Sequence, residues 1–292
     1  MIRVGVAGWS YDDWDGIVYP ARKPSRFDRL AYLAGFLDTL EVNSTFYRIP
    51  QAKVTQSWAR RVQARPDFRF TAKLYQGFTH KRAELQGGEE AAFHEAMQPL
   101  LEAGVLAGVL VQFPYSFRPG AASREVLERI VEAFGALRLV VEIRHADWNS
   151  KEFFDYLRQH DVGFCNLDQP RIASSIGPTE TATSAIGYVR LHGRNADNWF
   201  RRKAEPWERY DYQYAEEELV PWVTRIRRIA EQTTDVFIIA NNHYRGKAPL
   251  AALTLLAMLR GEKVPAPAEL VAAYPQIAPR AVSRGSGQGR LF

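Results

Sequence analysis

Three ionisable side chains stand at or near the ends of short apolar segments and are of the types that acid/base catalysis requires. Glu41 follows the segment LDTL, Glu142 follows RLVV and His192 follows IGYVRL. Two carboxyl groups in different surroundings can serve as an acid and a base, and histidine titrates near neutral pH. We predict that Glu41, Glu142 and His192 are catalytic, with His192 assisting the proton transfer between the glutamates and the substrate.

Three basic residues in the same kind of position predict that the substrate is an anion. Lys73, Arg144 and Arg190 each follow apolar segments, and the guanidinium fork matches phosphate and carboxylate groups. The competing interpretation is that each arginine pairs with Glu41 or Glu142, because buried ion pairs are common. The other side chains that we expect to bind the substrate are polar or aromatic: Asn43, Gln112, Asp168, Asn241, Asn242, Trp9, Tyr11, Tyr47 and Trp148.

Acid/base chemistry on an anion predicts a hydrolase or lyase without a redox cofactor, but two other uses of the same residues stay open. Two carboxyl groups about 5–10 Å apart beside aromatic side chains would suit a glycosidase-like hydrolase. Glu142, Asp168 and His192 would suit a divalent metal ion, although nearby Arg and Lys charges oppose a cation. We therefore predict no metal, with a divalent ion as the alternative. His80 and His243 are weaker candidates.

Several common active-site patterns are absent from the sequence. Neither GxGxxG nor GxxxxGK[ST] occurs, which disfavours dinucleotide and P-loop nucleotide sites. Ser10 and Ser44 lack the pattern of a nucleophile elbow. Cys165 is the single cysteine, so no disulfide can form within the chain. We expect it to face the helices as a core residue.

Alternating apolar segments and amphipathic stretches predict the elements that position these residues. We expect strands at 2–8, 37–43, 68–74, 106–113, 138–144, 162–168, 186–192 and 235–241. We expect helices at 51–64, 89–103, 122–135, 150–160 and 214–232. Strands alternating with helices indicate parallel βαβ units. Eight such units favour a closed (β/α)8 TIM barrel as a single domain, with an open doubly wound sheet as the alternative.

The alternation within each strand predicts which side chains face the inside of the barrel. Residues two apart share a face, so Glu41 shares a face with Asn43, and Arg190 with His192. Gln112, Asn166 and Asp168 have the corresponding parity in their own strands. One face of each strand is apolar and the other becomes polar toward its C-terminal end, where barrel sites are built. The sequence therefore predicts one charged, aromatic-rimmed pocket at that end.

Six spaced segments resemble the YecE-like family, also called domain of unknown function 72. They are GWSYDDWDGIVYP at 8–20, EVNSTFYRIP at 41–50, FRFTAKL with TH at 79–80, VEIRHADW at 141–148, YVRLHGR at 188–194 and NNHYRGKAP at 241–249. The resemblance extends from residue 2 to about residue 260 and implies a TIM barrel, but it brings no assigned reaction. The sequence differs from the family pattern by having GVAGW where Gly-Thr-Ser-Gly-Trp is common, and this replaces no ionisable residue.

The charge of the chain allows a nucleic-acid partner without requiring one. The net charge is +5, from 38 Lys and Arg against 33 Asp and Glu, and Arg280, Arg284 and Arg290 lie in or near a Gly/Ser-rich tail. We expect a barrel domain at 1–279 and a flexible basic tail at 280–292. The tail and the aromatic, Arg-containing insertion at 195–212 predict the alternative function of a nucleic-acid-binding module. The chain has no signal-peptide or membrane-spanning pattern, so we expect a cytoplasmic protein that does not bind membranes.

Overall fold

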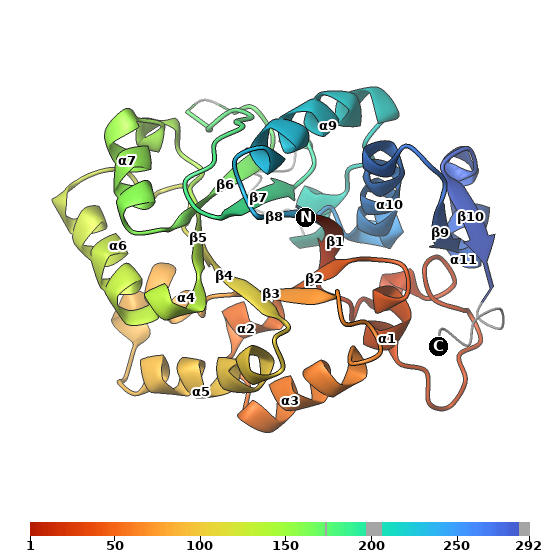
Figure 1. Ribbon diagram of the computed structural model, residues 1–292, viewed down its shortest axis with the longest axis horizontal. Coiled ribbons are helices and arrows are strands. Elements are labelled where there is room, and N and C mark those ends of the chain that lie inside the picture. The colour runs from red at the N-terminus through yellow and green to blue at the C-terminus, as the bar shows by residue number, and fades with distance from the viewer. Residues whose placement is uncertain (173, 197–205, 286–292) are drawn as a thin grey trace.

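Eight parallel strands form a closed barrel, in which β1 completes the ring against β8 (Figure 1). This computed structural model describes residues 1–172, 174–196 and 206–285. The predicted single-domain (β/α)8 barrel is confirmed, and each predicted strand overlaps an observed one. The strands are β1 (Ile2–Ala7), β2 (Thr39–Val42), β3 (Arg69–Lys73), β4 (Leu106–Gln112), β5 (Leu139–Glu142), β6 (Gly163–Asp168), β7 (Ile186–Leu191) and β8 (Asp235–Ala240).

Helices surround the barrel, and the five predicted ones appear as α3, α5, α6, α7 and α9 (Figure 1). The longer helices are α1 (Arg29–Ala34), α3 (Ala52–Arg61), α5 (Glu89–Glu102), α6 (Ala121–Phe134), α7 (Lys151–Gln159), α9 (Glu216–Ala230) and α10 (Lys247–Arg260). The short α-helices are α2 (Ser44–Tyr47), α4 (Gln76–Thr79) and α11 (Ala268–Ala273). The 3₁₀ turns are η1 (Asp12–Trp14), η2 (Arg82–Glu84), η3 (Gly135–Leu137), η4 (Ala146–Trp148), η5 (Pro206–Tyr210), η6 (Tyr244–Gly246) and η7 (Pro275–Ile277).

The inward face of the barrel carries the predicted polar side chains in most strands, but the prediction for β6 is wrong. In the register of β6 with β7, Cys165 lies beside Tyr188 and Asp168 lies beside Leu191. Since Tyr188 points into the barrel, Cys165 points inward with it, while Asn166 and Asp168 point outward.

A polar covering on the outside of β6 explains this error. The Asn166 side chain donates a hydrogen bond to the Thr181 carbonyl oxygen at 3.0 Å and accepts one from the Thr179 hydroxyl at 2.7 Å. Both partners belong to the segment between β6 and β7, whose described residues form no helix. The outward face of this strand is therefore hydrogen-bonded to a loop, so it is polar where the other strands are apolar.

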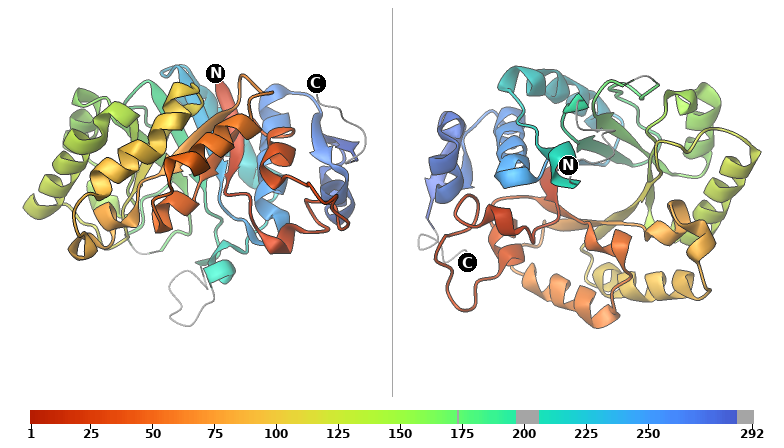
Figure 2. Two further views of the ribbon diagram at one scale, coloured as in Figure 1. Left: turned by 90° about the horizontal axis from the view of Figure 1, so that it is seen from below. Right: turned by 180° about the vertical axis from the view of Figure 1, so that it is seen from behind.

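A small parallel pair of strands, β9 (Val264–Pro267) and β10 (Ala281–Arg284), lies outside the barrel beyond α10 (Figure 2). Helix α10 is covered on both sides, by β1 and β8 and by this pair, which explains why it is apolar almost all round. The predicted tail begins at residue 280, and its first residues include β10 and Arg280, which forms an ion pair with Glu216. Residues 286–292 lie outside the described residues.

The two ends of the barrel sequence meet at the contact between β1 and β8. The Trp14 indole donates a hydrogen bond to the His243 carbonyl oxygen at 2.7 Å, and the Arg245 amide donates one to Asp13. The first and last of the spaced sequence motifs are thus neighbours in space. In the described part of the chain, no helix is both long and apolar enough to cross a membrane.

Candidate active site

A pocket of about 530 Å³ opens at the C-terminal ends of the strands. Of the residues predicted to form the site, seven line this pocket: Trp9, Tyr11, Asn43, Tyr47, Lys73, Gln112 and Asn241. The pocket also includes residues that were not predicted: Gly8, Ser10, Ser44, Trp58, Tyr210 and His243. Of these, Ser10, Ser44 and His243 had been weighed in the sequence and set aside or ranked lower. The predicted catalytic residues Glu41, Glu142 and His192 do not line it.

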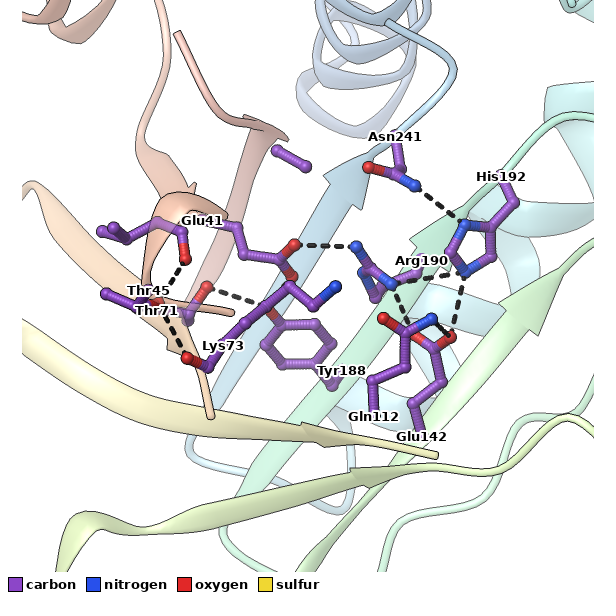
Figure 3. A network of polar contacts seen from close by, with 12 residues as sticks. Glu41, Thr45, Thr71, Lys73, Gln112, Glu142, Tyr188, Arg190, His192 and Asn241 are labelled. Carbon is purple, nitrogen blue, oxygen red and sulfur yellow. Dashed lines mark hydrogen bonds and ion pairs between the residues drawn. The ribbon is translucent and has the colours of Figure 1, made fainter. Parts of the chain in front are cut away.

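Arg190 joins Glu41 and Glu142 in a buried network inside the barrel (Figure 3). Arg190 Nη2 lies 2.7 Å from Glu41 Oε1, and Arg190 Nη1 lies 2.5 Å from Glu142 Oε2. The Tyr188 hydroxyl donates to Glu41 Oε2 at 2.9 Å and lies 2.7 Å from the Thr71 hydroxyl. The competing interpretation of Arg190, as an ion-pair partner of both glutamates, therefore describes its contacts.

Glu142 has further partners on the side of β4 and β7. Arg144 Nη2 lies 2.9 Å from Glu142 Oε1, and Gln112 donates to the same oxygen at 2.9 Å. His192 Nε2 lies 3.4 Å from it, and the Asn241 side-chain nitrogen lies 3.0 Å from His192 Nδ1. Gln112 and Asn241 thus connect the buried network to the pocket wall.

The charges of this network are fixed near neutral pH. Burial alone would raise the pKa of Glu142, but Arg190 and Arg144 outweigh it and hold that pKa well below its ordinary value. Burial lowers the pKa of His192 to about 3, and the positive charges of Arg144 and Arg190 act in the same direction. Glu142 is therefore ionised and His192 is neutral, so neither is poised to give up a proton at pH 7.

Lys73 is the ionisable group that reaches the pocket from the inner face of the barrel. Its side chain is 6% exposed, and Nζ lies 4.0 Å from the centroid of the Phe46 ring. Among the described residues, no carboxylate lies within ion-pair distance of Nζ and no group hydrogen-bonds to it. Burial lowers the pKa of Lys73 to about 7, and the neighbouring Arg190 charge contributes to this shift.

The main chain at Lys73 is held by a threonine from the preceding βα unit. Thr45 follows β2, and its hydroxyl lies 2.9 Å from the Val42 carbonyl oxygen and 2.7 Å from the Lys73 carbonyl oxygen. One buried hydroxyl therefore connects the C-terminal ends of β2 and β3. This contact fixes the position from which the lysine side chain enters the pocket.

Aromatic side chains form the wall opposite Lys73, and a glycine allows their placement. Gly8 has a φ of +75° and donates its amide to the Glu41 carbonyl oxygen at 2.9 Å. A side chain at Gly8 would collide with the Tyr11 hydroxyl, 2.8 Å from the position of its Cβ. Tyr11 stacks on the His243 ring with 4.5 Å between centroids. Trp9 packs edge-on against Trp58 with 5.6 Å between centroids.

Besides Arg144 and Arg190, which belong to the buried network, three predicted substrate contacts do not line the pocket. Asp168 faces outward, where it accepts hydrogen bonds from Arg194 and from the Trp222 indole. Trp148 is buried and stacked on Phe117 with 5.3 Å between centroids. The Asn242 side-chain nitrogen donates to the Tyr212 carbonyl oxygen at 2.8 Å. These residues have structural contacts that account for their polarity or size.

Two alternative predictions were a divalent metal site and a nucleic-acid-binding insertion, and the described residues do not form a site for either. Glu142 and His192 are close together, but Asp168 points away from them, so the proposed three-ligand set is not assembled. In the described ranges no other group of three His, Cys, Asp or Glu side chains is suited to a metal. Most of the insertion proposed to bind nucleic acid, residues 197–205, lies outside the described residues.

Comparisons with known proteins agree with the fold and with the resemblance of the motifs. The family model described as protein of unknown function DUF72 matches residues 3–273. The chain is 30% identical to the UPF0759 protein YunF of Bacillus subtilis over 273 residues, which are 89% of this chain and 95% of that one.

Two solved structures of DUF72 family proteins are similar over most of their length. The one from Thermotoga maritima is 33% identical with a TM-score of 0.79, covering 89% of this chain and 99% of that one. The one from Enterococcus faecalis is 26% identical with a TM-score of 0.78, covering 89% and 96%. Together with the family model, which spans nearly the whole chain, these matches establish the relationship. The chain belongs to the DUF72 family of proteins of unknown function.

Proposed function

We propose that the chain is an enzyme, of the lyase class, that acts on a small anionic molecule through acid/base chemistry centred on Lys73. The observation that carries this proposal is the position of Nζ, which is buried at the pocket without a carboxylate partner among the described residues. Because the pKa of Lys73 is about 7, the amine is present in both protonation states near neutral pH. Such a group can take up a proton and return it within one reaction cycle.

The contacts of the two glutamates favour a lyase over a glycosidase-like hydrolase. Glycoside hydrolysis needs one protonated carboxyl group and a second ionised one, both in contact with the sugar. Here Glu41 and Glu142 are fully buried beneath the pocket, and both accept hydrogen bonds from Arg190. Their role in this proposal is to hold Arg190 in place behind Lys73.

The charge balance supports an anionic substrate. Glu41 and Glu142 offset the charges of Arg144 and Arg190, so a protonated Lys73 adds a positive charge that the network does not neutralise. A second depression adjoins the pocket at Trp9 and Ser10 and is lined by three arginines. Two of them, Arg29 and Arg61, form ion pairs with aspartates. For the third, Arg26, no acidic partner occurs within the described ranges, and it would suit a phosphate or carboxylate group.

The proposal can be tested by exposing the protein to a mixture of sugar phosphates and small oxo acids and following each compound by mass spectrometry. Lys73→Met removes the amine but keeps an unbranched side chain that is shorter by one atom. Lys151→Met is the matched control, because Lys151 lies on α7 with a side chain that is 83% exposed. We expect the wild type and Lys151→Met to consume a compound that Lys73→Met leaves unchanged. Consumption by all three proteins, or by none, would overturn the proposal.

A further inference from the structure

The surroundings of Lys73 Nζ suit the formation of a covalent bond as well as the transfer of a proton. A lysine becomes a nucleophile when its amine is desolvated or lies beside another cation, and both conditions hold here. Lys73 is buried, with 6% of the residue exposed, and the positive charge of Arg190 lowers its pKa. Across the described residues, the pocket wall brings no carboxylate to Nζ that would hold it as an ammonium ion.

The pocket wall also contains polar atoms whose hydrogen-bonding capacity is unused. Asn43 Oδ1 and His243 Nδ1 are buried, and neither has a hydrogen-bond partner in the described part of the chain. Both residues line the same pocket as Lys73. Because buried polar atoms are normally satisfied, these two atoms would suit a ligand with hydroxyl groups, which can donate to an amide oxygen and either donate to or accept from a histidine nitrogen.

We propose that Lys73 Nζ adds to the carbonyl carbon of an aldehyde or ketone bound in this pocket and forms a protonated imine with it. This inference rests on the proposed function and names its substrate class. The nitrogen–carbon bond forms as the carbonyl π electrons move to oxygen, which takes up a proton. The resulting hydroxyl leaves as water after a second protonation, while the nitrogen loses one of its two original protons. The balance is one amine, one carbonyl and one proton consumed, with one protonated imine and one water formed.

The protonated imine explains why a lyase would place its lysine here. The positive nitrogen accepts the electron pair released when the bond between the adjacent carbon and the next one breaks, and the hydroxyl on that next carbon loses its proton, so this fragment leaves as an aldehyde. The enamine that remains takes up a proton on carbon and becomes an imine again, and water then returns the carbonyl group and the free amine. No oxidant or reductant is required. The hydroxyl-bearing, anionic aldehydes and ketones that fit this scheme are the same class that Asn43, His243 and the arginine-lined depression would recognise.

Trapping with borohydride tests the inference, because it reduces an imine to a stable amine. The full chain is incubated at pH 7 with glyoxylate or glycolaldehyde, which are an anionic and a neutral aldehyde of similar size, and is then treated with borohydride. Peptide mapping by mass spectrometry locates the adducts. At this pH an amine with a pKa near 7 has roughly a thousandfold more of its neutral form than an ordinary lysine. We expect an adduct on Lys73 before other lysines are modified, and more of it with glyoxylate.

Two variants separate this inference from the proposed function. Lys73→Arg keeps a positive charge and Lys73→Met does not, and both are first shown to be folded by circular dichroism. Both should lose the early adduct, while Lys151→Met should keep it. Adducts spread over exposed lysines at equal rates in the wild type and Lys73→Arg would overturn the imine. If no early adduct forms on Lys73 but a compound is still consumed only by proteins that have Lys73, the imine is rejected and the acid/base function stands.

Discussion

Arg190 and Lys73 are two buried cations on the same inner face of the barrel, yet their surroundings differ completely. Each of the two terminal nitrogens of the Arg190 guanidinium forms an ion pair with a carboxylate. Burial opposes its charge, but Glu142 and Glu41 raise the pKa of Arg190 well above its ordinary value. Lys73 has an aromatic ring instead of a carboxylate, and burial lowers its pKa. The same type of position on the inner face of a barrel can therefore hold a cation that is neutralised by ion pairs or a cation that has no carboxylate partner among the described residues, and the proposed function rests on the second kind.

The largest expected effect comes from replacing each cation by the same apolar side chain. Arg190→Met leaves two buried carboxylates without their guanidinium, and breaking a buried pair in this way costs about 3–5 kcal/mol of the free energy of unfolding. Lys73→Met leaves no such charge behind and removes an amine whose pKa is lowered by folding, so at pH 7 it should not decrease the free energy of unfolding. Denaturant unfolding measures both values. Equal losses in the two variants would show that Lys73 also has a structural ion-pair role.

The pH dependence of stability should distinguish the two cations next. The folded protein holds Lys73 at a pKa of about 7, and the ordinary value is 10.5. Between these values the unfolded chain binds more protons, so stability rises with pH. We expect a gain on the order of 2–4 kcal/mol from pH 7 to 10.5 in the wild type relative to Lys73→Met.

Taking the difference between the two proteins removes contributions from neighbouring groups. Burial raises the pKa of Cys165 and of Tyr188, so these groups make stability fall as pH rises, in both proteins alike. Arg190 stays charged over this range, since its pKa is raised, and Glu142 stays ionised, since its pKa is lowered. Parallel curves for the wild type and Lys73→Met would contradict a lowered pKa at Lys73.

The smallest expected effect concerns the hydroxyl that holds the Lys73 main chain. Thr45→Val removes a buried donor that lies near two carbonyl oxygens, and we expect a loss of about 1 kcal/mol. Thr45→Ser keeps the hydroxyl and serves as the control. Borohydride trapping on Lys73 should slow by a few-fold in the valine variant alone. Equal trapping rates in both variants would show that the lysine is positioned by other contacts.

The barrel could be predicted from the sequence because period-two alternation and strand–helix spacing are local properties. The failure at β6 has a local origin as well. Polarity on a strand marks the inside only when apolar side chains cover the outside. The outward Asn166 and Asp168 instead form hydrogen bonds with a loop, with Arg194 and with the Trp222 indole of α9. Trp148 was misplaced for a related reason, because an aromatic residue just after a strand can pack between helices as readily as over the pocket.

The sequence predicted many of the residues that line the candidate site, but it did not predict which of them would be in contact with one another. The residue types and their strand parity identified Lys73, Gln112 and Asn241, which do reach the pocket. Which cations find carboxylate partners depends on distances across the barrel, and these are set by strand register and tilt. Residue type and parity therefore could not distinguish Arg190, which lies in the buried network, from Lys73, which reaches the pocket. His243 was ranked low because a histidine after a strand resembles an exposed loop residue.

The contact between the first and last motifs has a consequence for the synthesis of the protein on the ribosome. The contacts of the Trp14 indole and the Tyr11 ring with His243 cannot form until His243 is synthesised, more than two hundred residues later. Such a distant pairing makes closure of the ring a late step in folding. A nascent chain that has emerged only as far as β7 has Lys73 but lacks the Asn241 and His243 side of the pocket. The chemistry proposed for the lysine would thereby be confined to chains whose ring has closed.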